Sequence, residues 1–269
     1  MTNRKPYTLM RAQGRDRRHL LRGAVAAAGA AMLSGCDRLS SNAWFVAALN
    51  SAEKLSHAAG RLVAPKSAMA QEFSQADVAP VFRGNGTLDP QDPDYLALKK
   101  EGFAAYRLSV GGLVEKPFEL SLEQLRALPS RTQITRHDCV EGWSCIGKWK
   151  GVPLAALLDQ ARPTAEARFV VFRCFDSMGS ALDGRDTRYY ESIDLEEAQH
   201  AQTLLAYELN DKPLPVINGA PVRARIERQL GYKHAKYVKA IELVASFAAI
   251  RGGKGGYWED EGYEWYAGI

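Results

Sequence analysis

Cysteine is scarce in this chain, which has four cysteines in 269 residues: Cys36, Cys139, Cys145 and Cys174. No Cys-x-x-Cys-His sequence occurs, which excludes the usual covalent attachment of a c-type haem. The three cysteines after Cys36 are too few for an iron–sulfur cluster with four ligands of its own. We therefore expect neither haem nor an iron–sulfur cluster, so that any electrons must be exchanged with a separate protein.

Long apolar runs and nucleotide-binding loops are missing as well. A membrane-spanning helix needs about 20 apolar residues, whereas the uncharged stretch 23–35 stops at Cys36. Nowhere do a strand, a glycine-rich loop and a helix follow one another as a nucleotide-binding α/β fold requires. The net charge is only +4, and basic residues before position 23 supply part of it, so we expect no nucleic-acid partner.

The beginning of the chain is typical of an export signal, with seven basic residues followed by a weakly apolar stretch. Arg17-Arg18 indicates twin-arginine export, which carries folded proteins. Leu33-Ser34-Gly35-Cys36 resembles a lipobox, and Asp37 resembles an inner-membrane retention signal. We expect a signal peptide over 1–36 and a lipid anchor at Cys36 that holds the protein on the periplasmic side of the cytoplasmic membrane. An accidental buried cysteine is the alternative.

The rest of the sequence predicts a stalk and a single domain. A helical stripe within 37–75 consists of Trp44, Ala48, Ala52, Leu55, Ala59 and Leu62. Residues 76–269 contain no long linker and no internal repeat. Short strands are predicted at 106–110, 132–137, 168–175, 203–209 and 237–244, with short helices after Ser121 and from Pro153. We therefore expect an α+β, strand-dominated domain.

The stretch from His137 to Cys145 is chemically the richest. Cys139 follows a predicted strand and precedes the turn residue Gly142. A zinc site is poorly supported, because Cys139 and Cys145 do not have the short spacing of zinc ligands. A Cys139–Cys145 disulfide stays open, as does a nucleophilic pair of Cys139 with His137 or His234.

Three motifs occur in order along the domain. They are Cys139-Val140-Glu141-Gly142-Trp143-Ser144, Asn218-Gly219-Ala220-Pro221-Val222-Arg223 and Gly231-Tyr232-Lys233-His234-Ala235-Lys236. From about 106 to 244 the chain thereby resembles the sulfite oxidase family, in particular the bacterial branch that contains the catalytic subunit of periplasmic methionine sulfoxide reductase. The resemblance implies a sulfite oxidase-type molybdopterin-binding fold and a molybdenum–molybdopterin cofactor. It also implies that Cys139 is the protein ligand of the metal, and a soft thiolate suits such a site.

The same resemblance implies a set of cofactor-binding residues. Arg223 offers a planar fork of donors for phosphate oxygens, and Lys236 offers a point charge. A solvated basic strand face is the alternative for the basic residues around them. The positions that match pterin contacts are Asn85, Asn218, Arg223, His234, Ala235 and Lys236.

Two further residues concern the reaction. Glu141 stands next but one to Cys139, so we expect it to relay protons. The resemblance also implies that Cys174 is a cofactor-binding position, where the methionine sulfoxide reductase branch has a threonine, and this difference weakens the transfer of a substrate from that branch. The aromatic tail 252–269 is a lid, a docking surface or a packed segment, and packing is the simplest interpretation.

These observations predict an exported oxidoreductase that catalyses two-electron oxygen-atom transfer on a small substrate, either sulfite or an S- or N-oxide. Its electrons are expected to pass through a separate membrane-bound subunit that is linked to haem or quinone. A sulfite dehydrogenase is the first alternative to a reductase. The second is a cofactor-binding lipoprotein without catalysis that serves as an assembly subunit.

Overall fold

The computed structural model describes residues 42–63, 67–179 and 186–269. The predicted signal sequence and Cys36 lie outside these residues. The chain divides into one unit up to Ala58 and a second unit, Ala59–Ile269. Helix α2 (Ala43–Val63) confirms the helix that the apolar stripe predicts, while its role as a stalk stays a prediction. Among the described helices, none is long and apolar enough to cross a membrane.

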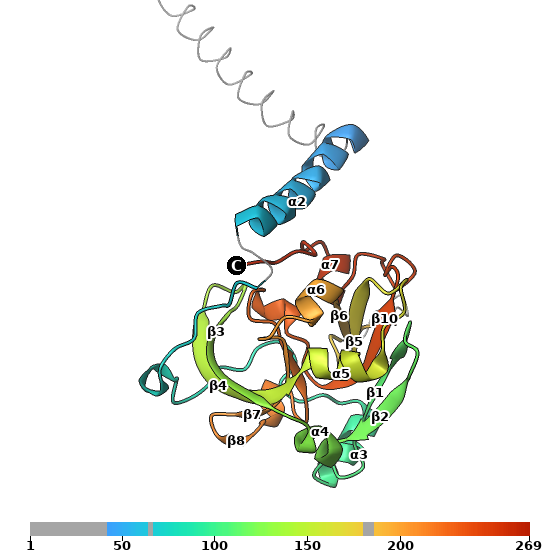
Figure 1. Cartoon of the computed structure of the whole chain (residues 1–269). Helices are drawn as coiled ribbons and strands as arrows, with labels where there is room; N and C mark the ends of the chain where they lie inside the picture. Colours follow the sequence, from blue (N-terminus) through green and yellow to red (C-terminus); the bar gives the residue numbers. More distant parts are fainter. Residues whose placement is uncertain (1–41, 64–66, 180–185) are drawn as a thin grey trace, which may run out of the picture. The chain divides into compact units, whose positions relative to one another are not determined.

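The second unit is built on two five-stranded sheets (Figure 1). The first has the order β2-β1-β10-β5-β6 and consists of β1 (Arg107–Gly112), β2 (Phe118–Ser121), β5 (Phe169–Ser177), β6 (Arg188–Asp194) and β10 (Val238–Val244). The second has the order β3-β4-β7-β8 with β9 beside β7, and consists of β3 (Arg131–Asp138), β4 (Ser144–Pro153), β7 (Leu204–Leu209), β8 (Lys212–Pro213) and β9 (Arg223–Arg225). Only the β1–β10 pair is parallel among these strands. The predicted strand-dominated α+β fold is thus confirmed.

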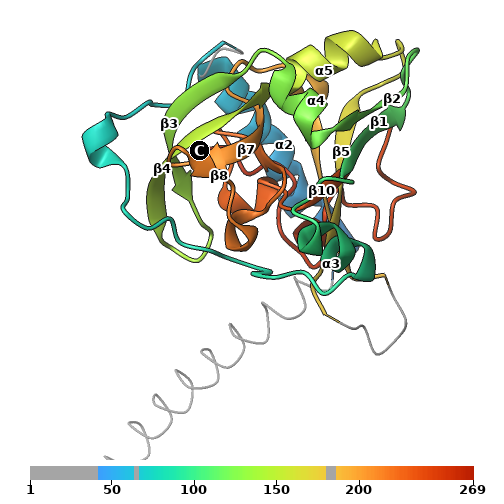
Figure 2. The same cartoon turned by 90° about the horizontal axis from the view of Figure 1, so that it is seen from below.

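Short helices precede, connect and follow the strands, and Figure 2 labels α3, α4 and α5. They are α3 (Pro93–Lys100), α4 (Leu122–Ala127), α5 (Leu154–Ala161), α6 (Leu195–Ala198) and α7 (Tyr257–Asp260), with 3-10 turns η1 (Gln75–Asp77), η2 (Val216–Asn218) and η3 (Gly231–Lys233). The capping box predicted for α4 is present, since the Gln124 N–H donates to Ser121 Oγ at 3.0 Å and the Ser121 N–H donates to Gln124 Oε1 at 2.8 Å. Pro153 is the N-cap of α5 and not its first helical residue.

The apolar core joins the two sheets and α5. Leu108 and Phe172 come from the first sheet, Leu205 from the second, and Leu157 from the helix, and all four side chains are fully buried. Strand β3 faces this interior with a polar row, because Gln133, Thr135 and His137 alternate inward and are buried. The next residue of the row is Cys139, so the strand points the cysteine inward at its end.

Candidate active site

A cavity of about 680 Å3, counted with its opening to solvent, lies beside the turn between β3 and β4. Its walls come from segments that are far apart in the sequence. Five of the residues predicted from the sequence line it, namely Asn85, Cys139, Glu141, His234 and Lys236. The fold thus brings the first and third motifs together around one opening.

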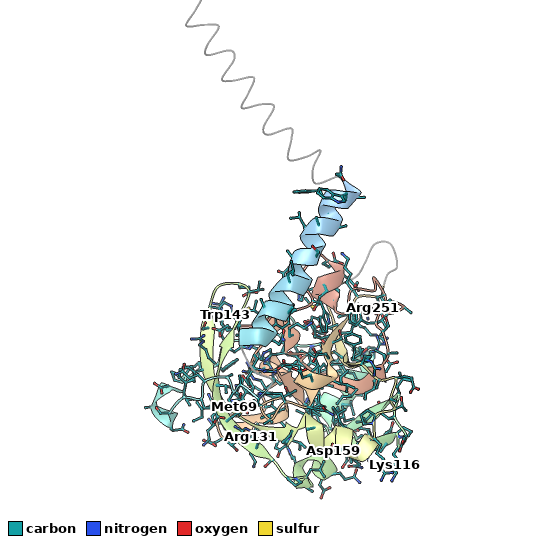
Figure 3. All side chains as sticks on the ribbon, turned by 45° about the horizontal axis from the view of Figure 1, so that its top comes forward. Met69, Lys116, Arg131, Trp143, Asp159 and Arg251 are labelled. Atoms are coloured by element: carbon teal, nitrogen blue, oxygen red, sulfur yellow. The ribbon has the colours of Figure 1, made fainter. Side chains whose placement is uncertain are left out.

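Cys139 is held by the β3–β4 turn. Its N–H donates to the Trp143 carbonyl and its carbonyl accepts from the Gly142 N–H, both at 2.9 Å. Gly142 has a φ of +84°, a conformation that favours glycine. Trp143, labelled in Figure 3, closes this turn. The turn therefore fixes the backbone on both sides of the thiol.

The Cys139 thiol is buried and faces the Asn85 side chain, whose Nδ2 lies 3.9 Å from Sγ. Burial raises the pKa of the thiol, and a hydrogen bond from the Glu141 backbone opposes this shift. A bound metal ion would displace the proton, since metals bind the thiolate.

Three alternatives for Cys139 are wrong in this structure. Cys139 and Cys145 are both free, because the hairpin register places Cys145 opposite His137. No group of three metal-binding side chains of the zinc type occurs in the described chain. His137 contacts Arg225 at 2.9 Å and His234 contacts the Gln229 carbonyl at 3.0 Å, and in the described chain no hydrogen bond joins either imidazole to Cys139.

Lys236 braces one side of the cavity. Its Nζ donates to the carbonyls of Asn85 at 2.6 Å, of Ile217 at 3.3 Å, and of Thr87. Because an ammonium group has three donors, these bonds use all of them. Burial lowers the pKa of Lys236 to about 7, Arg223 adds to this shift, and Asp176 opposes it. Lys236 thus fixes the loop that carries Asn85.

Arg223 lies deeper than Lys236 and is 1% exposed. Its guanidinium donates to the Asn218 carbonyl at 2.9 Å and to the His234 carbonyl at 3.4 Å, and it stacks 5.1 Å from the Trp149 ring. Burial lowers the pKa of Arg223 to about 9, and the neighbouring charge of Arg225 adds to the shift. The interpretation of this region as a solvated basic face is therefore wrong for the second and third motifs.

Buried nitrogen atoms without hydrogen-bond partners gather around Arg223. Within the described residues they are Nε of Arg223, Nδ2 of Asn218, Nδ1 of His234, Nε2 of His137 and Nε1 of Trp149. The residues lie in contact, since Arg223 contacts Asn218, His234 and Trp149. The His137 and His234 rings lie 5.0 Å apart. Four of these nitrogens are donors, whereas Nδ1 of His234 is an acceptor, because Nε2 of this neutral ring donates to the Gln229 carbonyl. Unsatisfied buried donors are costly unless a ligand accepts from them. This cluster therefore fits a group with several acceptor oxygens, such as the phosphate of a pterin cofactor.

The cavity wall is also shaped for close approach. Gly231 lines it, and a Cβ at this position would lie 2.6 Å from Nε2 of His137. Burial, together with Arg225 and Arg223, holds the pKa of His137 well below its usual range. Burial and Arg225 do the same to His234. Both imidazoles are thus neutral, and each can donate through one nitrogen only.

Four predicted residues do not line the cavity, namely Asn218 and Arg223, described above, and Cys174 and Ala235. Cys174 is 3% exposed on β5, opposite Val238 of β10, and burial raises its pKa well above the usual range. Ala235 is fully buried, and its carbonyl accepts from the Ala224 N–H at 2.8 Å. These two residues pack the protein behind the cavity wall.

The structure adds residues that the sequence analysis missed. Asp176 lines the cavity near the end of β5, is 3% exposed, and has one carboxylate oxygen without a partner in the described chain. Burial raises the pKa of Asp176 to about 6, although Lys236 opposes the shift. Its position directly after the predicted strand 168–175 was the available signal. Trp258 and Tyr263 line the cavity from the aromatic tail.

The fold and this site define a class of protein. Residues 96–248 match the family described as oxidoreductase molybdopterin binding domain. The match covers more than half of the chain, so the chain belongs to this family of oxidoreductases. The predicted molybdopterin-binding fold and family are confirmed.

Several curated proteins are similar to the chain. A putative protein-methionine-sulfoxide reductase subunit, YedZ1, from Azospira oryzae is 41% identical over 61% of this chain and 56% of its own length. The protein-methionine-sulfoxide reductase catalytic subunit MsrP from Xanthomonas axonopodis pv. citri is 37% identical over 58% of this chain and 50% of its own length. The chain thus spans about half the length of these relatives. The sulfane dehydrogenase SoxCD from Paracoccus pantotrophus aligns at 22% identity with a TM-score of 0.45, over 53% of this chain and 39% of that chain.

Proposed function

We propose that this chain is an exported molybdopterin-dependent reductase of S-oxides, with methionine sulfoxide as the representative substrate. The observation that carries the proposal is the buried Cys139 thiol, which lines the cavity together with His234, and the carbonyl of His234 bonds Arg223 at the centre of the unsatisfied donors. The relatives that are named methionine sulfoxide reductases support this direction of reaction. The reaction takes two electrons and two protons and converts an S-oxide into a thioether and water.

The chain's own residues would divide the work of holding the cofactor. Cys139 would ligate the molybdenum, and Asn218, Arg223 and His234 would hold the phosphate-bearing pterin. When bound, the cofactor supplies a metal that changes oxidation state by two and exchanges an oxygen atom. Lys236 would act through the loop that it braces, which places Asn85 next to Cys139.

Protons would reach the substrate oxygen along the cavity wall. Glu141 is exposed, lines the cavity, and accepts a hydrogen bond from Trp143 Nε1 at 2.9 Å. This contact orients the carboxylate at the entrance, where it can take protons from water. Asp176 lines the same cavity and is 3% exposed, so it lies deeper than Glu141.

Electrons would come from a separate membrane-bound subunit that is linked to haem or quinone. The word "subunit" in the names of both relatives supports a partner. Twin-arginine export and a lipid at Cys36 would place the domain beside such a partner on the periplasmic side of the cytoplasmic membrane. A Cys36→Ala variant should then leave the membrane fraction after export, and retention after a carbonate wash would refute the lipid anchor.

Protein purified from its own membranes tests the activity. Molybdenum per chain is measured first, and reduced viologen then supplies electrons for methionine sulfoxide, dimethyl sulfoxide and an N-oxide. Oxidation of sulfite by ferricyanide is the opposite arm. We expect S-oxide reduction that Cys139→Ser abolishes. Sulfite oxidation without S-oxide reduction would establish the dehydrogenase instead, and folded protein with molybdenum but neither activity would support the assembly subunit.

A further inference from the structure

The C-terminal tail, which follows the family-matched residues 96–248, supplies part of the cavity wall. Trp258 belongs to α7 and Tyr263 follows it, and both line the cavity. Their rings stack with centroids 5.3 Å apart and an angle of 27° between planes. Tyr232, from the third motif, meets Tyr263 edge to face at 5.2 Å. We call Tyr232, Trp258 and Tyr263 the aromatic wall.

The aromatic wall and the polar groups divide the lining of the cavity. Cys139, Asp176 and Lys236 supply the thiol and the charged groups, while the aromatic wall supplies ring surfaces. Tyr263 is 38% exposed and Tyr232 is 9% exposed, so the wall reaches from the interior to solvent. A substrate can therefore place a polar head inside and an apolar arm along the rings.

Buried contacts hold the tail in this position. Lys233 Nζ lies 2.5 Å from Oε1 of Glu259 on α7 and 2.5 Å from Oε1 of Glu191 on β6. The Tyr232 hydroxyl donates to the Glu264 carbonyl at 2.7 Å. Further along, the Leu230 N–H donates to the Ala267 carbonyl at 2.8 Å. The tail is thus fastened on both sides of Tyr263, which makes the wall a preformed surface.

We propose that the aromatic wall is a substrate-binding surface that selects S-oxides with an apolar arm on sulfur, as in a methionine sulfoxide side chain within a peptide. This inference rests on the proposed function. Methyl and thioether groups make favourable contacts with aromatic rings. A compact anion such as sulfite gains nothing from them, because the face of an aromatic ring carries negative charge density. The wall is therefore a determinant of specificity, and the polar residues opposite it serve the reaction.

The test compares two S-oxides in one enzyme. Reduction of a peptide that contains methionine sulfoxide and of dimethyl sulfoxide is measured with reduced viologen for the wild-type holoenzyme, Trp258→Leu and Trp258→Phe. We expect Trp258→Leu to raise KM for the peptide between about twofold and about tenfold, the range of a sulfur–aromatic contact. The kcat for both substrates and KM for dimethyl sulfoxide should change less than twofold. Trp258→Phe keeps a ring and should restore most of the affinity for the peptide.

Trp44→Leu is the matched control, since this tryptophan lies on α2, is 76% exposed and does not line the cavity. Molybdenum content and a thermal melt of each variant show whether a change in KM reflects binding and not folding. An equal change for both S-oxides, or none, in a folded and metal-loaded Trp258→Leu protein would overturn the role of the wall. Failure of the wild-type enzyme to reduce either S-oxide would instead overturn the proposed function.

Discussion

Replacing Lys233 with methionine should lower the free energy of unfolding, because Lys233 neutralises buried acids behind the cavity. The side chains of Lys233, Glu191 and Glu259 are at most 1% exposed, so one cation faces two carboxylates without water. Burial alone would lower the pKa of Lys233, but the two carboxylates overcome this effect and raise it. Burial, and next the charge of Glu259, raise the pKa of Glu191 well above its usual range. Removal of the cation leaves two buried acids, which costs about 3–5 kcal/mol of unfolding free energy.

The pH dependence separates this cause from a simple packing defect. When the pKa of an acid is higher in the folded protein than in the unfolded one, the free energy of unfolding falls as the pH rises from the unfolded-state pKa to the folded-state pKa. The deficit of Lys233→Met should therefore be smaller at pH 5 than at pH 8, as measured by urea unfolding. Lys239→Met is the control, because Lys239 is 44% exposed and lies 3.6 Å from a carboxylate oxygen of Asp94, so less than about 1 kcal/mol is expected. A Lys233→Met deficit below about 1 kcal/mol at pH 8, or one that grows on acidification, would refute the reasoning.

Three other predictions concern the cavity. Arg223→Ala should lower molybdenum per chain, because loss of one charge-assisted contact weakens cofactor binding by about ten- to a hundredfold. The molybdenum content of Arg223→Lys should lie between those of the wild type and Arg223→Ala. Full metal occupancy of Arg223→Ala with a raised KM would show that this residue binds the substrate. In metal-free protein, burial raises the pKa of Asp176 to about 6, so wild-type stability should fall as pH rises from about 4 to 6. Asp176→Asn should remove that fall and gain about 2–3 kcal/mol above pH 6 in urea unfolding, and an unchanged pH profile would contradict it. Cys145→Ser should alter molybdenum content and turnover less than twofold, in contrast to Cys139→Ser, and a large loss would show that Cys145 supports the site.

Strands in which apolar and polar residues alternate could be predicted from the sequence, whereas β4 could not. Its sequence contains two glycines and two lysines, which do not indicate a strand. The structure explains the glycines by close contacts that arise only in the folded protein. A Cβ at Gly147 would lie 2.9 Å from the Phe82 ring, and a Cβ at Gly151 would lie 2.3 Å from the Leu205 carbonyl oxygen.

The residues of the candidate site also differ in whether a local sequence pattern reveals them. Cys139 and Arg223 could be found because each stands in a motif of adjacent residues. Trp258 could not, because only the fold brings the tail to the cavity, and for Asp176 the sequence offered only its position directly after the predicted strand 168–175. The basic residues of the third motif suggested a solvated face for a related reason, since Glu191 and Glu259, which neutralise Lys233, are 42 and 26 residues away in the sequence.

The bond from Lys236 to the Asn85 carbonyl joins residues that are 151 positions apart. The loop beside Cys139 is therefore held by a contact that forms only when Asn85 and Lys236 have come together, so a cofactor that needs this loop would bind after these parts of the chain have folded. Threading the polypeptide through a narrow channel would break this bond and release whatever the cavity held. Transport after cofactor binding must therefore carry the folded domain, because a pathway that transports the unfolded chain would deliver the protein without its cofactor.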